Sequence, residues 1–154
     1  MCLPKIILIS CLTIILLISN ILAAEIAVIV NKESKITTIT PQETAALFLG
    51  RKQSTRSMQV VTIIEQPRDS ELRKDFFRLV NGMSLIQVNA YWSRLQFSGD
   101  IQPPIVLSNN QSVLRAVQND IKAIGYIDSN FVDDSIRVAL ILKDHNEQLL
   151  GYVQ

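Results

Sequence analysis

Residues 58–80 constrain the fold of this chain most strongly. They form a short apolar run, then a polar turn, then an amphipathic helix. The run has four β-branched residues, which favour a strand covered on both faces: Val60, Val61, Ile63 and Ile64. Pro67 disfavours helix at the residue before it, so the chain turns there. A strand that leads into a helix in this way is the basic unit of an α/β domain.

The helix that follows has one face to bury. Asp69 or Ser70 can cap its first turn, and its apolar residues recur at helical spacing: Leu72, Phe76, Phe77 and Val80. The backbone amides of the first turn point toward the end of the strand, where they form a general anion site. An ordinary capped helix without a ligand has the same pattern.

The same turn carries the candidate ligand-binding residues Arg68, Asp69, Ser70 and Arg73. Guanidinium groups suit tetrahedral oxyanions, and the Ser70 hydroxyl adds a hydrogen-bonding group beside the helix amides. Asp69 and Glu71 place two negative charges at the same helix end, where they satisfy the helix dipole and repel an anion. The two arginines of the turn therefore favour an oxyanion, whereas its two acidic residues oppose one.

Residues 1–24 are typical of a secretory signal peptide, with Lys5 ahead of an apolar run that ends at Ala23 and Ala24. We therefore expect cleavage after Ala24 and a periplasmic or secreted protein. Leu22 is bulkier than the residue usual at its position, so an uncleaved segment that anchors the protein is the alternative. The apolar run of about 17 residues is at the lower end of the length that spans a bilayer.

Composition limits the remaining 130 residues (154 minus 24) to one domain. Both cysteines lie in the first 24 residues, so the mature chain can form no disulfide. Without Lys5 the formal charge of +1 falls to zero, which leaves no basic field to recruit nucleic acid. From about residue 143 the chain becomes a polar tail, with a short strand or a docked segment as options near its end.

Strands and helices alternate along the mature chain. We expect strands at 25–30, 60–64, 105–107, 123–127 and 136–142, and helices that start near residues 40, 70, 84 and 109. This order predicts a layered α/β domain in which helices flank a mixed or mostly parallel sheet of about five strands.

Catalytic chemistry is hard to assemble from these residues. The mature chain has no thiol and one histidine, His145, which a Ser-His-Asp triad would have to use. The five glycines stand singly, so the sequence has no Walker loop and no dinucleotide-binding motif. Asp133 and Asp134 could bind a cation weakly but are more typical of a turn. We therefore expect neither an enzyme nor a bound metal or cofactor.

Three segments resemble the small PstS-like, PBP-like domain proteins, which are related to the phosphate-binding protein of the phosphate ABC transporter. Residues 40–52, TPQETAALFLGRK, resemble the helix of that family that ends in a Phe-Leu-Gly-Lys signature. Residues 90–104, AYWSRLQFSGDIQPP, are similar to a block typical of the short members. Residues 123–127, AIGYI, resemble the family's late Gly-Ala-Ile-Gly-Tyr strand.

The resemblance implies a type II periplasmic binding fold reduced to a single lobe. Two-lobed relatives hold phosphate between lobes that close by a hinge, and the matching lobe contributes an Arg and an Asp-Gly-Ser-Gly-Thr turn at a helix start. This chain keeps Asp69 and Ser70 there, lacks the glycines, and has larger residues next: Glu71, Leu72 and Arg73. The backbone therefore approaches an anion less closely, and we expect at most a modest affinity.

These patterns lead to a first hypothesis of an exported, non-enzymatic solute-binding-like protein related to phosphate uptake. It would bind phosphate or another small oxyanion and work with an ABC transporter permease or another envelope protein. The alternative hypothesis is a periplasmic protein-interaction or envelope-assembly module without a small-molecule ligand. In that case a partner, or a second copy of the chain through self-association, supplies the missing lobe. A hydrolase ranks third, because a nucleophile and a base are lacking.

Overall fold

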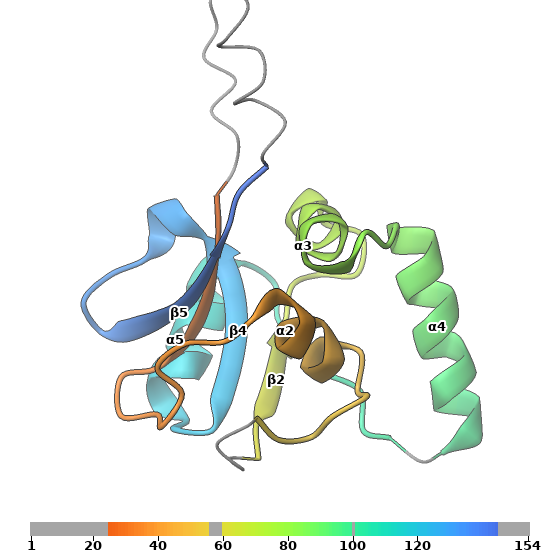
Figure 1. Cartoon of the computed structure of the whole chain (residues 1–154), viewed down its shortest axis with the longest axis horizontal. Coiled ribbons are helices and arrows are strands. Elements are labelled where there is room, and N and C mark those ends of the chain that lie inside the picture. Colours follow the sequence, from red (N-terminus) through yellow and green to blue (C-terminus); the bar gives the residue numbers. More distant parts are fainter. Residues whose placement is uncertain (1–24, 56–59, 100, 145–154) are drawn as a thin grey trace, which may run out of the picture.

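A computed structural model describes residues 25–55, 60–99 and 101–144 of the chain. The expected signal segment 1–24, His145 and the expected strand or docked segment near the end lie outside the described residues. In the described part, a five-stranded mixed sheet is flanked by helices, which confirms the predicted fold class (Figure 1). Within these ranges we find no helix with both the length and the apolar character needed to cross a membrane.

The sheet has the strand order β3-β2-β4-β1-β5. Its strands are β1 (Ile26–Asn31), β2 (Thr62–Glu65), β3 (Ile105–Val106), β4 (Ala123–Asp128) and β5 (Ile136–Leu142). β2 runs parallel to β3 and β4, whereas β1 runs antiparallel to β4 and β5. The carboxyl ends of β2, β3 and β4 therefore meet at one edge of the sheet, called here the carboxyl edge. Their amino ends meet at the opposite edge, the amino edge.

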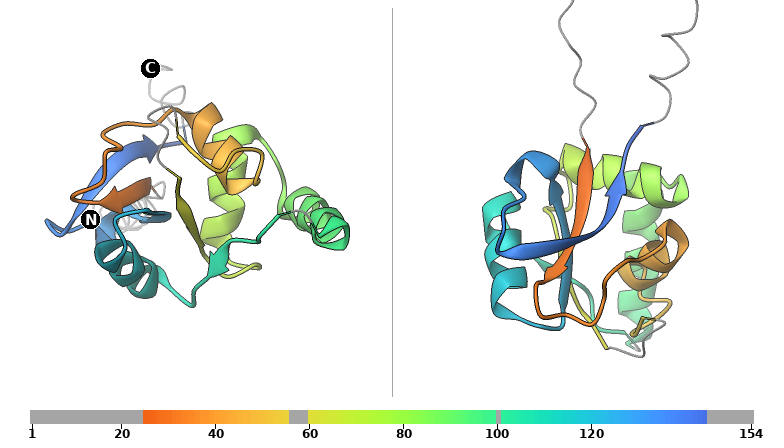
Figure 2. Two further views of the ribbon diagram at one scale, coloured as in Figure 1. Left: turned by 90° about the horizontal axis from the view of Figure 1, so that it is seen from below. Right: turned by 60° about the vertical axis from the view of Figure 1, so that its left-hand side comes forward.

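Helices cover both faces of this sheet. α2 (Pro41–Phe48) and α3 (Glu71–Asn81) pack on one face, and α5 (Asn110–Asn119) packs on the other (Figure 2). α4 (Leu85–Ser98) stands beside α3 at the side of the molecule, and the short 3-10 helix η1 (Ser129–Phe131) follows β4. Each α-helix starts at a side-chain cap that accepts a backbone N–H three residues on: Thr40, Ser70, Ser84 and Asn109.

The sheet separates two apolar layers. In the layer under α2 and α3, the rings of Phe76 and Tyr126 stack with centroids 3.8 Å apart, and Phe48 packs edge-on against both. In the other layer, Val113, Leu114 and Val117 of α5 pack against β1 and β4. β1 contributes to both layers, and its apolar residues are completely buried, as its unbroken apolar sequence predicts.

Two predicted strands differ from the structure at their ends. β2 begins at Thr62, and Val60 is 59 % exposed and forms only an isolated bridge with Ser54. The prediction of a strand covered on both faces is therefore wrong for Val60, because this residue precedes β2 and takes no part in the regular pairing of the sheet. β3 has only two residues, and both Ile105 and Val106 are exposed.

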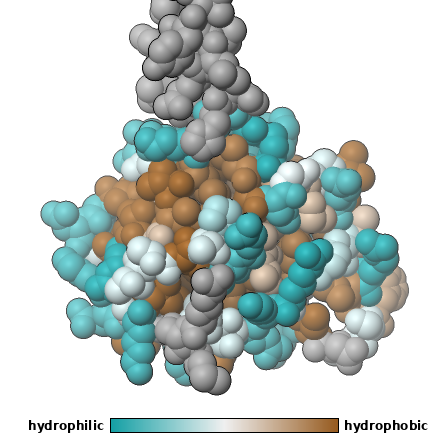
Figure 3. Space-filling model, viewed as in Figure 1, coloured by the Kyte–Doolittle hydropathy of each residue, from teal (hydrophilic) through white to brown (hydrophobic). Residues whose placement is uncertain are grey.

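Hydrophobic side chains also gather on the surface over β5 and the strands beside it, where hydrophilic residues surround them (Figure 3). β5 is the edge strand at this side of the sheet, and its Ile141 is 38 % exposed. Because several hydrophobic residues gather here, the region is a patch, but no described residue indicates what would cover it.

Candidate functional site

The turn between β2 and α3 lies at the carboxyl edge and carries the four predicted site residues. Arg68 and Asp69 are exposed, and Ser70 is half-buried at the helix start. The backbone N–H of Ser70 donates to the Pro67 carbonyl oxygen at 3.1 Å, which closes the turn. The Ser70 hydroxyl oxygen accepts the backbone N–H of Arg73 at 3.2 Å, so the predicted cap is confirmed. Among the described residues, the Arg68 guanidinium has no hydrogen-bond or ion-pair partner.

Arg73, in contrast, lies inside the molecule, with only 2 % of its surface exposed. Its Nε donates to Oε1 of Glu65 at 3.0 Å, and its Nη1 donates to the Arg68 carbonyl oxygen at 2.9 Å and to Oδ1 of Asn89 at 2.8 Å. The guanidinium carbon also lies 5.2 Å from the centroid of the Phe77 ring. Arg73 therefore joins α3 to β2 and α4, and its guanidinium does not stand free beside the helix amides as the sequence suggests.

Glu65, the last residue of β2, is the buried partner of this arginine, with 2 % of its surface exposed. Burial raises the pKa of the Glu65 carboxyl above its ordinary value, and the nearby Arg73 charge opposes that rise. A buried ion pair is costly to break, because removal of one partner leaves the other charge without compensation. The Glu65–Arg73 pair therefore fixes the geometry of the carboxyl edge from within.

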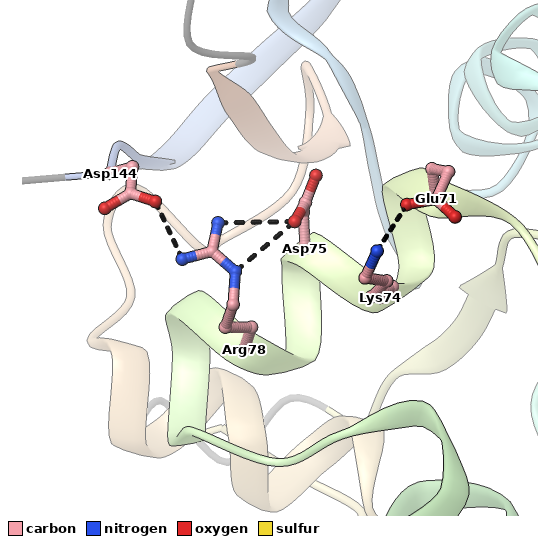
Figure 4. Close-up of polar contacts among 5 residues, drawn as sticks. All are labelled: Glu71, Lys74, Asp75, Arg78 and Asp144. Atoms are coloured by element: carbon pink, nitrogen blue, oxygen red, sulfur yellow. Dashed lines mark hydrogen bonds and ion pairs between the residues drawn. The ribbon is translucent and has the colours of Figure 1, made fainter. Parts of the chain in front are cut away.

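The exposed charges of α3 are largely paired with one another (Figure 4). Nζ of Lys74 lies 2.7 Å from the Glu71 carboxylate, and Arg78 bonds both Asp75 and Asp144. Glu71 is one of the two acidic residues that the sequence places against an anion at this helix start. Because Lys74 partly neutralises it, Asp69 is the main source of repulsion there.

A second helix start lies at the same edge, and sequence reasoning missed its proximity. The side-chain amide of Gln66 donates to Oδ1 of Asn110, the first residue of α5, and to the Tyr126 carbonyl oxygen, each at 2.9 Å. Asn109 caps α5 by accepting the Ser112 N–H at 2.9 Å. The rule that parallel strands present their carboxyl ends at one edge could have brought these residues together from the sequence.

The carboxyl edge offers an open surface and no deep pocket among the described residues. A depression of about 20 Å³ lies beside Arg73, where Glu65, Arg68, Asn89 and Val106 are among its lining residues. That volume accommodates about one water molecule, so phosphate does not fit inside it. An anion at this edge would contact Arg68 and the turn from the solvent side.

Metal chemistry finds no support in the described ranges, where no group of three or more His, Cys, Asp or Glu side chains could hold an ion. Asp133 serves the turn before β5. Its carboxylate accepts the backbone N–H of Ser135 at 2.9 Å and also the Ser135 hydroxyl, and these bonds hold its pKa below the ordinary value. The interpretation of Asp133 as a turn residue is confirmed.

Comparison with known proteins identifies the fold. No protein-family profile matches the chain, and no curated protein does. Among solved structures, the chain is similar to a protein of Clostridium perfringens assigned as a phosphate ABC transporter substrate-binding protein and solved with bound phosphate. The TM-score is 0.60 at 18% identity, over 83% of this chain and 51% of that one.

Two further structures have the same relation to the chain. An ABC-type phosphate transport receptor from Vibrio cholerae has a TM-score of 0.57 at 19% identity, over 75% of this chain and 46% of its own. PstS from Borrelia burgdorferi has a TM-score of 0.56 at 19% identity, over 80% and 49%. The chain therefore spans about half the length of these binding proteins, and its fold is that of one lobe of a periplasmic binding protein.

Proposed function

We propose that the protein binds a small oxyanion, with phosphate as the first candidate, at the carboxyl edge of its sheet. The observation that carries this proposal is the exposed guanidinium of Arg68 at the start of α3, which has no partner in the part of the chain that the structure describes. The first-turn amides of Glu71 and Leu72 have no partner within the helix, as at every helix start. A guanidinium beside free amides is a suitable arrangement for a tetrahedral anion.

Each predicted residue has a distinct part in this proposal. Arg68 contacts the anion directly, and the Ser70 hydroxyl, whose oxygen already accepts the Arg73 N–H, keeps its own hydrogen to donate. Arg73 does not contact the anion but positions the turn, because its Nη1 donates to the Arg68 carbonyl oxygen. Asp69 only accepts hydrogen bonds when ionised, so it tolerates hydrogen phosphate, which carries a proton, better than sulfate, which carries none.

The cellular setting of the proposal is solute uptake. Two of the three neighbours are described as proteins of phosphate transport and the third as PstS, and the first 24 residues of this chain are typical of an export signal. We therefore propose a periplasmic protein that presents phosphate to an ABC transporter permease. The described chain provides no opposing lobe to exclude water from the anion, so we expect a dissociation constant of about 1 mM, or roughly 4 kcal/mol of binding free energy.

Titration calorimetry of the purified protein with phosphate tests the proposal. We expect saturable heat in the millimolar range, and weaker binding of sulfate. Arg68→Ala should lower the phosphate affinity about tenfold, because it removes a charge-assisted hydrogen bond. The matched control is Arg94→Ala, which removes an exposed arginine from α4 and should leave the affinity unchanged. Absence of saturable heat with the unaltered protein, or an Arg68→Ala affinity equal to that of the control, would overturn the proposal.

A further inference from the structure

A cavity of about 540 Å³ opens toward the amino edge of the sheet. It borders the small depression beside Arg73, because Trp92, Pro103 and Pro104 line both. Its lining comes from the segments that precede or begin three parallel strands: residues 60–63 at β2, 101–105 at β3 and Lys122 just before β4. Leu47 and Gly50, at the end of α2, and Trp92 of α4 complete it. The volume lies in the range of small-molecule sites in proteins, about 300 to 1,000 Å³.

The walls of this cavity combine apolar and polar surface in similar amounts. The lining residues with apolar side chains include Leu47, Ile63, Trp92, Ile101, Pro103 and Ile105. Two apolar residues of the lining are well exposed to solvent, Val60 at 59 % and Ile105 at 50 %. Exposure of such residues around one hollow favours an occupant with an apolar body, since its binding would remove their surface from water.

The polar groups of the cavity are mostly hydrogen-bond donors. Lys52 and Lys122 line it, and neither ammonium has an ion-pair partner among the described residues. None of the lining residues that the structure describes is acidic. The indole N–H of Trp92 is buried and also lacks a hydrogen-bond partner in the described part of the chain. Two lysines without ion-pair partners among the described residues favour a negatively charged ligand, although the Asp120 carboxylate accepts the backbone N–H of Lys122 at 2.8 Å.

We infer that this cavity is a second binding site, for a small organic anion with an apolar body and one carboxylate. The apolar part of the walls receives the body, and Lys52 and Lys122 receive the carboxylate. Inorganic phosphate has no apolar part and would leave the walls exposed, so the site is separate from the oxyanion site proposed at Arg68. The inference does not depend on the function of the carboxyl edge.

Trp92 lines this cavity and is the only tryptophan of the chain, so its fluorescence can follow binding there. Because Trp92 also lines the depression beside Arg73, the lysine variants below identify which site is occupied. The probe is 4-phenylbutyrate, which has an aromatic body and a carboxylate, and its matched uncharged analogue is 4-phenylbutan-1-ol. We expect a saturable change in tryptophan emission with the acid, at a concentration about tenfold lower than with the alcohol, since a charge-assisted bond is lost in the alcohol. No saturable change with the acid, or equal affinities for acid and alcohol, would overturn the inference.

Lysine variants test the charged end of the site in the purified protein. Lys122→Gln and Lys52→Gln together should reduce the affinity for the acid to that of the alcohol. Lys32→Gln removes the same charge from a lysine that bonds the Asp134 carbonyl oxygen and lies outside the cavity lining, so it should have no effect. An equal loss in the Lys32→Gln variant would show a general charge effect and contradict the site. Displacement of the acid by inorganic phosphate would contradict its separation from the oxyanion site.

Discussion

The two edges of the sheet use their polar groups in opposite ways. At the carboxyl edge, Glu65, Arg73 and Asn89 bond one another inside the molecule, and only a depression of about 20 Å³ remains. At the amino edge, a cavity of about 540 Å³ is lined by two lysines without ion-pair partners among the described residues. The buried polar residues of the carboxyl edge therefore stabilise the fold, and only its exposed residues can contact a ligand. The two lysines of the amino edge have no such structural part and can bind a ligand directly.

The largest expected effect comes from breaking the buried pair of the carboxyl edge. Arg73→Met keeps most of the side-chain volume but leaves Glu65 buried without its cation. We expect the free energy of unfolding to fall by about 3 to 5 kcal/mol, the range found when one partner of a buried ion pair is removed. Urea unfolding monitored by circular dichroism measures this loss.

Two further variants test whether the loss of stability comes from the broken Glu65–Arg73 pair. Arg68→Ala removes an exposed arginine from the same turn and should change the free energy of unfolding by less than about 0.5 kcal/mol. Glu65→Leu combined with Arg73→Met removes both charges and should recover much of the loss. If Arg73→Met and Arg68→Ala had similar effects, Arg73 would not have the structural part assigned to it.

A smaller effect is expected at Gly50, which lines the amino-edge cavity. Gly50 has a φ of +67°, and a Cβ at this position would lie 3.1 Å from both Trp92 and Ile101. Gly82 has a φ of +73° but has no atom within 4 Å of the same position. Gly82→Ala should therefore cost about 1 kcal/mol from backbone strain alone, and Gly50→Ala should cost about 1 kcal/mol more.

Urea unfolding of both glycine variants checks this difference. We also expect the emission of Trp92 to shift in Gly50→Ala and not in Gly82→Ala, because only the first substitution places a Cβ against the Trp92 ring. Equal costs for the two substitutions would mean that Trp92 does not pack on Gly50 and that the cavity lining differs from the one described.

The smallest effect concerns Tyr126, which lies buried between the two edges. Burial and the Glu65 charge raise the pKa of its phenol well above 10.0. The folded state therefore holds this proton more tightly than the unfolded state does, so stability is full below about pH 10 and falls as the pH rises above it. Tyr126→Phe should remove that dependence.

The Tyr126 hydroxyl has no hydrogen-bond partner of ordinary geometry among the described residues, and the nearby Gln66 backbone lowers its pKa only slightly against the effect of burial. At pH 7 we therefore expect Tyr126→Phe to be as stable as the unaltered protein or up to about 1 kcal/mol more stable. Unfolding free energies at pH 7 and at about pH 11 measure both effects. A clear loss of stability at pH 7 would indicate that the hydroxyl has a bonding partner.

Local sequence signals predicted most of the fold. The caps Thr40, Ser70 and Ser84 marked helix starts because their bonds reach only three residues along the chain. The burial of Arg73 was not predictable in this way, since it depends on Asn89 from another helix. The meeting of Gln66 with Asn110 joins residues 44 positions apart, and the amino-edge cavity assembles from several segments. Local periodicity carries no information about such contacts.

The most direct test of the central claim is a titration of the ¹⁵N-labelled protein with phosphate, followed by amide chemical shifts. The account predicts that the largest changes occur at Arg68, Glu71 and Leu72, where the turn meets the start of α3, and that they saturate in the millimolar range. Changes confined to Lys52 and Lys122 at the amino edge, or no saturable change anywhere, would contradict an oxyanion site at the carboxyl edge.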